Sequence, residues 1–225
     1  MGSVDENRDF FKMDNGTKKR LEAKFLDFKG NVTEFDLGPV KIQIEPKIYK
    51  EFLKISEADA IEEFRSLCLI YLETCLRYKV PLRKANILLL TDDEISRGCE
   101  VMFQAQDGTF WGYIFIPPLD LKLAYGFWVF TFLHELGHCW IEMERPQDEE
   151  GLVGFEISSD LIAICALRRL IPPHTKIYRN VLKSRSYVGS VGKKYLDKEC
   201  YNNILENPEA YLEAKMMERW KIERK

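Results

Sequence analysis

Two histidines four residues apart, with a glutamate directly after the first, lie within the apolar segment FWVFTFLHELGHCWIE, residues 127–142. Its apolar residues recur at helical spacing, so the segment predicts a partly buried helix. Residues four apart share one helix face, and His134 and His138 can therefore point their imidazole nitrogens at one ion. Glu135 is offset by about 100° around the axis, which puts it beside such an ion. This motif constrains the fold more than any other feature, because the rest of the chain must complete a metal site around the helix.

Two histidines do not complete a catalytic zinc site, which has three protein ligands and one open position. The remaining histidine, His174, follows two prolines at a predicted helix end, where an exposed side chain is the commoner outcome. Glu156 and Asp160 lie four apart in the apolar segment 155–170 and so face the same way. We expect Glu156 to be the third ligand and Asp160 to accept a hydrogen bond from the second nitrogen of a ligating histidine. The alternative for both acids is stabilisation of a helix N-terminus by the macrodipole.

The rest of the sequence predicts an α+β fold. Strands are indicated by alternating or strand-length apolar segments, and a hairpin by the Asp-Gly pair at 107–108. These strand segments are 24–28, 32–37, 40–46, 85–91, 101–106 and 109–118. Helical spacing appears over 57–78, with Ser56 as its N-cap, and over 155–170 after a loop at 143–154. Further helices are predicted to the C-terminus, the last over 207–225, so helices segregate against a small mixed sheet.

Composition excludes several other classes of protein. With 46% apolar and 31% charged residues among 225, the chain suits one globular domain, or one domain with an appendage. The longest apolar run, around 123–133, is too short to span a bilayer, and the N-terminus lacks a signal-peptide segment. We therefore expect a cytoplasmic protein without membrane contact. The six cysteines form no C-x-x-C pair, so they are predicted to be buried small hydrophobes and not disulfide partners or zinc ligands.

A basic segment lies towards the C-terminus. Residues 168–198 carry nine lysines and arginines against one acid, Asp197, with tyrosines interleaved among them. Such a segment can contact nucleic acid or an acidic protein. The alternative, which we favour, is a solvated face that balances the acidic loop 142–150.

The two motif segments resemble a known family. His134-Glu135-x-x-His138 followed by Glu156-x-x-x-Asp160 is the gluzincin arrangement, and HELGHCW with FEISSDLIAICALRRLIPP is similar to the ImmA/IrrE family of small intracellular metallopeptidases. The resemblance covers roughly residues 57–173 and is specific in the two motif helices. It implies a minimal zincin-like fold in which Zn²⁺ is held by the two histidines and Glu156. It also implies hydrolysis of a specific intracellular protein, with Glu135 as general base on zinc-bound water.

The chain is accordingly divided into a flexible leader (1–18), an N-terminal strand extension (19–50), a zincin-like catalytic domain (51–173) and a helical C-terminal extension (174–225). The strand TFWGYIFI, residues 109–116, is predicted to be an edge strand that pairs with an extended substrate peptide. The alternative function is an inactive zincin-like scaffold that binds a protein or nucleic acid through residues 168–198. The donor to the oxyanion stays open among Tyr113, Tyr178, Tyr187, His174 and Arg168.

Overall fold

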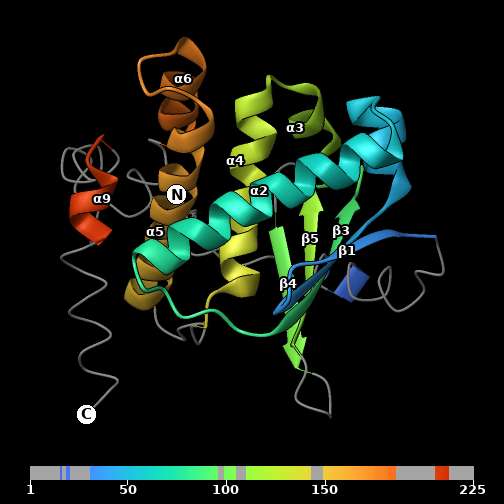
Figure 1. The fold of residues 1–225 in the computed structure, drawn as a ribbon, viewed down its shortest axis with the longest axis horizontal. Helices are drawn as coiled ribbons and strands as arrows, with labels where there is room; N and C mark the ends of the chain where they lie inside the picture. Colours follow the sequence, from blue (N-terminus) through green and yellow to red (C-terminus); the bar gives the residue numbers. More distant parts are fainter. Residues whose placement is uncertain are drawn as a thin grey trace, which may run out of the picture.

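The computed structural model describes residues 16, 19–20, 31–95, 99–104, 110–142, 149–185 and 206–212. Within these residues one mixed sheet packs against several helices, so the predicted α+β class is confirmed (Figure 1). The predicted strand at 24–28, the Asp-Gly turn at 107–108 and nearly all of the predicted leader lie outside the described residues. Among the described helices, none has the length and apolar character needed to cross a membrane.

The sheet has five strands in the order β1-β2-β3-β5-β4. The strands are β1 (Thr33–Asp36), β2 (Val40–Ile44), β3 (Ala85–Thr91), β4 (Cys99–Gln104) and β5 (Phe110–Ile116). β2, β3 and β5 run parallel, while β1 and β4 pair antiparallel at the two ends of the order. The two described strands of the predicted N-terminal extension, β1 and β2, thus belong to the same sheet as the strands that follow.

The predicted edge strand is an interior strand. β5 pairs with β3 from Ala85↔Phe110 to Thr91↔Ile116, and with β4 from Cys99↔Phe115 to Gln104↔Phe110. Both sides of β5 are therefore used, and the prediction that residues 109–116 form an edge is wrong. The described strand at this edge is β4. The hairpin pattern of the sequence shows that two strands pair with each other, but not which of them also pairs with a strand distant in the sequence.

Alternation along the strands separates the two faces of the sheet. Ile87, Leu89 and Ile114 belong to the main core beneath the helices. Leu88, Leu90, Tyr113 and Phe115 form a second buried cluster. Because successive side chains on a strand point to opposite faces, this second cluster lies on the face turned away from the main core.

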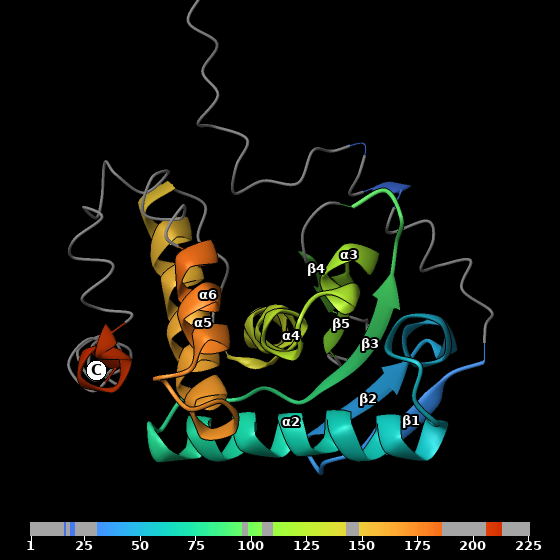
Figure 2. The same cartoon turned by 90° about the horizontal axis from the view of Figure 1, so that it is seen from above.

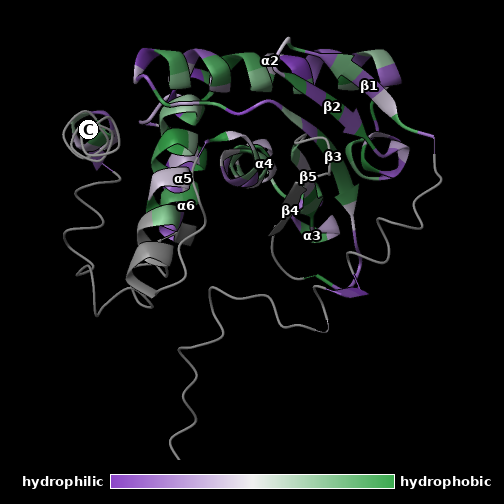
Figure 3. Cartoon of the chain, turned by 90° about the horizontal axis from the view of Figure 1, so that it is seen from below, coloured by the Kyte–Doolittle hydropathy of each residue, from purple (hydrophilic) through white to green (hydrophobic). Residues whose placement is uncertain are grey.

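The described helices are α2 (Glu57–Arg77), α3 (Pro118–Lys122), α4 (Tyr125–Trp140), α5 (Glu149–Leu170), α6 (Lys176–Arg185) and α9 (Pro208–Tyr211), with a π-helical turn η1 (Ile48–Leu53) before α2. α4 lies between the sheet and the pair α5 and α6 (Figure 2). Thirteen of the 16 residues of α4 are buried, so polar side chains on this helix are interior groups. Figure 3 shows the same arrangement by hydropathy, with hydrophobic colour along β3 and on α4.

Local sequence signals account for the start of α2 and the end of α5. α2 begins after Ser56, whose hydroxyl accepts a 3.1 Å hydrogen bond from the backbone N–H of Asp59, as predicted for an N-cap. α5 ends at Leu170, before Pro172 and Pro173, which cannot continue a helix. The final predicted helix is confirmed only at its start, because residues 213–225 lie outside the described part of the chain.

α5 begins earlier than the sequence predicts. Residues 149–154 were expected in a loop, but they form the first turns of the helix. Glu156 is therefore two turns inside α5. The field of a helix N-terminus falls off within the first turn, so the macrodipole does not explain its presence there.

Side chains pack tightly around the centre of α4. A Cβ added at Gly137 would lie 2.8 Å from Tyr71 Oη of α2 and 3.3 Å from Ser159 Oγ of α5. Glycine at position 137, between the two histidines in the sequence, lets these side chains of α2 and α5 approach the backbone of α4. Its cost in helix propensity is about 1 kcal/mol relative to alanine. The four cysteines whose side chains are described, Cys68, Cys75, Cys139 and Cys165, are buried and not joined in disulfides, as predicted for them.

Candidate metal centre

His134 and His138 lie one turn apart on α4 with their rings turned towards each other. The two Nε2 atoms are 3.0 Å apart, and the ring planes are nearly perpendicular. Both residues are buried, with 5% and 2% of their surface exposed. Helical spacing alone produces this convergence, as the sequence predicted.

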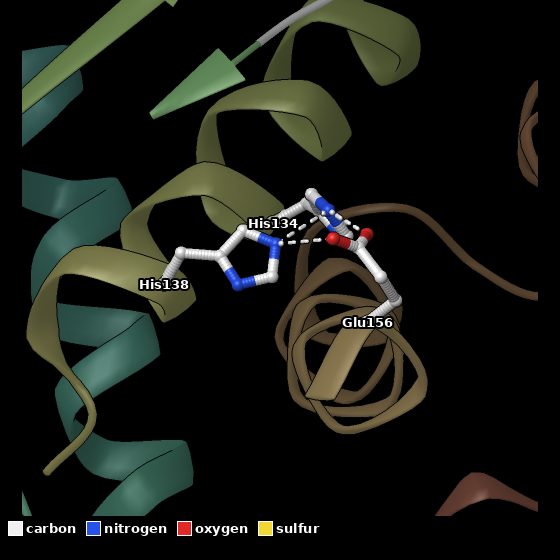
Figure 4. Close-up of side chains that lie close together, drawn as sticks. All are labelled: His134, His138 and Glu156. Carbon is white, nitrogen blue, oxygen red and sulfur yellow. Dashed lines mark hydrogen bonds and ion pairs between the residues drawn. The ribbon is translucent and has the colours of Figure 1, made fainter. Parts of the chain in front are cut away.

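Glu156 reaches the two histidines from α5, which packs against α4 (Figure 4). Its carboxylate oxygens lie 3.2 Å from His134 Nε2 and 3.5 Å from His138 Nε2. One ligand atom from each of the three residues lies within 4.8 Å of the other two, so the group can hold a metal ion. Residues that are 18 to 22 positions apart in the sequence are thus brought together by the packing of two helices.

The outer nitrogen of each ring has its own partner on α5. His134 Nδ1 lies 2.7 Å from Asp160 Oδ1, and His138 Nδ1 lies 3.0 Å from Ser159 Oγ. An ionised carboxylate only accepts hydrogen bonds, so a neutral His134 carries its proton on Nδ1 and donates it to Asp160. Its Nε2 is then a bare lone pair directed at His138 and Glu156. A buried carboxylate that faces two ring nitrogens is balanced by positive charge, which a proton on one of the rings or a metal ion between the groups can supply.

Ser159 is the functional residue that the sequence analysis missed. It lies three positions after Glu156, on nearly the same face of α5, and it has no exposed surface. A serine near a predicted ligand on an apolar helix was the available signal. Asp160, which was predicted, is fully buried as well. Each ligating histidine therefore has one partner on α5 that fixes the orientation of its ring.

The charge on Glu156 suits a ligand. Burial alone would raise the pKa of this carboxyl, but His138 and His134 outweigh burial and hold the pKa well below its ordinary value. The group is therefore ionised at neutral pH. It is also the most exposed of the three side chains, at 19% compared with 6% for His134 and 2% for His138.

Aromatic rings enclose the histidines. Phe155 stacks on His138 with ring centroids 4.5 Å apart, and the ring of Phe130 lies 6.0 Å from that of His134. Both phenylalanines are buried. Such walls lower the local dielectric, which strengthens electrostatic interactions inside the site.

Glu135 is buried on α4, with 5% of its surface exposed. Its position directly after His134 turns it about 100° around the helix from the ligand, so it is adjacent to the centre and not a member of the ligand group. A carboxylate buried in an apolar helix is costly, and function is a common reason for retaining one.

The other sequence candidates lie away from this centre. His174 is exposed and follows the end of α5, which runs 14 residues, or about 21 Å, beyond Glu156 before it stops at Leu170. Tyr113 belongs to the cluster on the opposite face of the sheet. Tyr178 and Arg168 lie near the C-terminal end of α5, and Tyr187 is outside the described residues. None of the described candidates for the oxyanion donor is therefore brought to the metal centre.

No protein-family model matches this sequence, and comparisons with curated proteins and with solved structures also find no match. The metal centre therefore has to be interpreted from its own chemistry.

Proposed function

We propose that this protein is a zinc-dependent metallopeptidase. The observation that carries the proposal is the spacing of the three ligand groups, whose closest atoms are 3.0, 3.2 and 3.5 Å apart. In a tetrahedral zinc site with bonds of about 2.0–2.2 Å, neighbouring ligand atoms are about 3.3–3.6 Å apart. The spacing agrees with this geometry to within a few tenths of an ångström. Two histidines and one glutamate with an open fourth position are also a ligand set of catalytic zinc sites.

His134, His138 and Glu156 would hold the ion, with Asp160 and Ser159 orienting the two rings. When bound, zinc supplies Lewis acidity, which polarises a peptide carbonyl and lowers the pKa of a coordinated water to about 7. Glu135 accepts the proton of the attacking water and passes it to the nitrogen of the leaving amine. A purely structural metal site has no need for a carboxylate in this position.

The fold and the family belong to the same proposal. A helix that carries both histidines, packed between a small mixed sheet and a helix that carries the glutamate, supports a minimal zincin-like fold. The polar residue four positions after the glutamate, here Asp160, supports the resemblance to the ImmA/IrrE family. The proposed substrate is accordingly a specific intracellular protein.

An extended substrate peptide would pair with β4. This strand is at the edge of the sheet, runs antiparallel to β5 and packs close to α4. Pairing with an edge strand provides affinity through backbone hydrogen bonds without requiring a particular side chain. The role that the sequence analysis gave to residues 109–116 therefore moves to their hairpin partner.

A backbone scan of a cleaved peptide tests this pairing. N-methylation at successive residues should reduce cleavage at every second position, because alternate N–H groups of a strand point to the neighbouring strand. An alanine scan of the same peptide is the control, since it leaves the backbone donors in place. Losses without a period of two would argue against strand pairing while leaving the metal chemistry untouched.

Metal content tests the proposal most directly. Purified protein, stripped with a chelator and reconstituted, should contain one zinc ion per chain by mass spectrometry of the metal. Glu135→Gln should contain the same amount, because Glu135 is not a ligand. If the wild type fails to bind stoichiometric zinc, the enzyme proposal is wrong.

Loss of the orienting side chains should weaken zinc binding without abolishing it. Asp160→Ala and Ser159→Ala are each expected to lower zinc affinity by about 10- to 100-fold, as is typical for groups that hydrogen-bond a ligand. A competition titration against a chromophoric chelator measures the affinity. Cys165→Ala shortens a buried side chain further along α5, away from the centre, and should leave the affinity within twofold of the wild type. An equal loss in all three variants would indicate general damage to the helix.

A further inference from the structure

A second pocket lies at the end of α5 that is remote from the metal centre. It has a volume of about 270 Å³, and its lining residues come from the C-terminal ends of α2 and α5 and from α9. Figures 1 and 2 show these helix ends and α9 next to one another. Its lining includes Arg77, Tyr78, Cys165, Arg168, Arg169 and Glu209. The α5 residues of the pocket lie nine to 13 positions beyond Glu156, or about 14–20 Å further along the helix axis. The pocket is therefore separate from the candidate metal centre.

The lining carries a surplus of positive charge. Three arginines face one carboxylate, that of Glu209, so the formal charge of the lining is +3 − 1 = +2. Arg168 pairs with Glu209 at 2.6 Å, and Arg169 pairs with Glu73, which lies outside the lining. Within the described residues, no carboxylate forms an ion pair with Arg77, whose guanidinium lies 5.6 Å from the ring of Tyr78.

The arginines lie near helix C-termini, where positive charge stabilises a helix, but this effect does not account for the surplus of positive charge. Each helix C-terminus carries about half a negative charge, so the ends of α2 and α5 together offset about one of the three arginines. With Glu209 included, the lining stays positive. Glu73 also pairs with Arg169, but it does so from the exposed surface, where ion pairs are weak.

The pocket is lined mainly by hydrogen-bond donors, which are the N–H groups of its arginines. A guanidinium has five N–H donors and no acceptor. Burial, followed by Glu209, raises the pKa of the Cys165 thiol to about 12, against the effects of Arg168 and Arg77. The thiol therefore stays protonated and is neither a nucleophile nor a metal ligand at neutral pH. A fitting ligand would be anionic and rich in acceptors.

We propose that this pocket binds an oxyanion, either phosphate or the phosphate group of an ester. Arginine forks match the oxygen geometry of such groups, which they bind through paired N–H donors. The volume is just below the range of about 300–1,000 Å³ typical of small-molecule sites, which suits one phosphate group and not an extended ligand. In the structure the carboxylate of Glu209 accepts a hydrogen bond from Arg168. Glu209 belongs to a helix of only four residues and is 40% exposed, so an incoming oxyanion competes with it for Arg168.

Calorimetric titration of the full chain with inorganic phosphate, at ionic strength held constant with chloride, tests the proposal. The wild type should show saturable binding to one site. Arg77→Gln should raise the dissociation constant about tenfold or more, because it removes a charge-assisted donor that has no described carboxylate partner. Glu209→Gln should lower the dissociation constant several-fold, because the competing carboxylate is gone.

Arg65→Gln is the matched control, since Arg65 is an exposed arginine on the same helix, outside the pocket. It should leave the dissociation constant unchanged. Phosphate bound at the metal centre would not respond to Arg77→Gln, so this variant separates the two sites. A nucleoside monophosphate in a parallel titration distinguishes a phosphate ester from the free ion. The proposal is overturned if neither the wild type nor Glu209→Gln binds phosphate saturably, or if Arg65→Gln weakens binding as much as Arg77→Gln.

Discussion

Glu135→Gln should abolish peptide hydrolysis while one zinc ion remains bound per chain. The substitution preserves the size of a buried side chain but removes the group that accepts the proton of the attacking water. General acid–base catalysis typically contributes 10²- to 10⁴-fold to a rate, and a loss on the order of 10³-fold is expected here. The assay incubates the protein with a mixture of cellular peptides in ¹⁸O-labelled water. Mass spectrometry then identifies new C-termini that carry the heavy oxygen.

The controls for this experiment separate catalysis from contamination and from metal loss. Glu62→Gln makes the same chemical change at an exposed position of α2 and should cleave like the wild type. Equal cleavage by the wild type and by Glu135→Gln would mean that a contaminant, or a different base, performs the reaction. If Glu135→Gln loses both zinc and activity, Glu135 holds the metal and is not a general base.

Elements whose signals are local could be predicted from the sequence. The helix of residues 57–77 and its Ser56 cap follow from apolar spacing and one hydroxyl, and β3 occupies the predicted range 85–91. The pairing of His134 with His138 is equally local, because one turn of helix separates them. Such features depend on periodicity and capping, which act over a few residues.

Features that depend on packing between distant segments were not predicted correctly. β4 lies at the sheet edge because β5 pairs with β3. The alternation of apolar residues within β3 and within β5 does not reveal that these two strands pair. Residues 143–154 were assigned to a loop, whereas α5 already begins at Glu149. Ser159 became recognisable only when α5 was seen against α4, with its hydroxyl near His138.

The proposed metal centre gives a reason for the burial of several polar groups in two apolar helices. Asp160 and both histidines are at most 5% exposed, and Glu156 is enclosed except at one side. Burial of ionisable groups is unfavourable unless they are paired or bind a metal. A ligand that binds only the folded state stabilises it by about 2.7 kcal/mol at 100 times its dissociation constant. Zinc should therefore raise the thermal stability of the protein as well as supply its chemistry.

Glu156→Ala should remove both the bound zinc and the thermal stability that zinc provides. The change leaves two histidine ligands, which are too few for a closed tetrahedral site, so stoichiometric zinc should be lost on gel filtration. Thermal unfolding, followed by circular dichroism with and without zinc, provides a second readout. The wild type should gain stability when zinc is added, and Glu156→Ala should gain none. Because the unfolding transition itself is measured, a variant that merely fails to fold is recognised at once.

His174→Ala decides between the two third ligands that the sequence offered. His174 is exposed and lies beyond the end of α5, so its removal should change neither zinc content nor the stability gained with zinc. The opposite pattern, in which zinc persists in Glu156→Ala and is lost in His174→Ala, would require α5 to be rearranged so that its far end met the two histidines of α4. Such a rearrangement would also break the contacts of Asp160 and Ser159 with the histidine rings. Metal content in these two variants therefore tests the packing of α4 against α5 as well as the identity of the ligand.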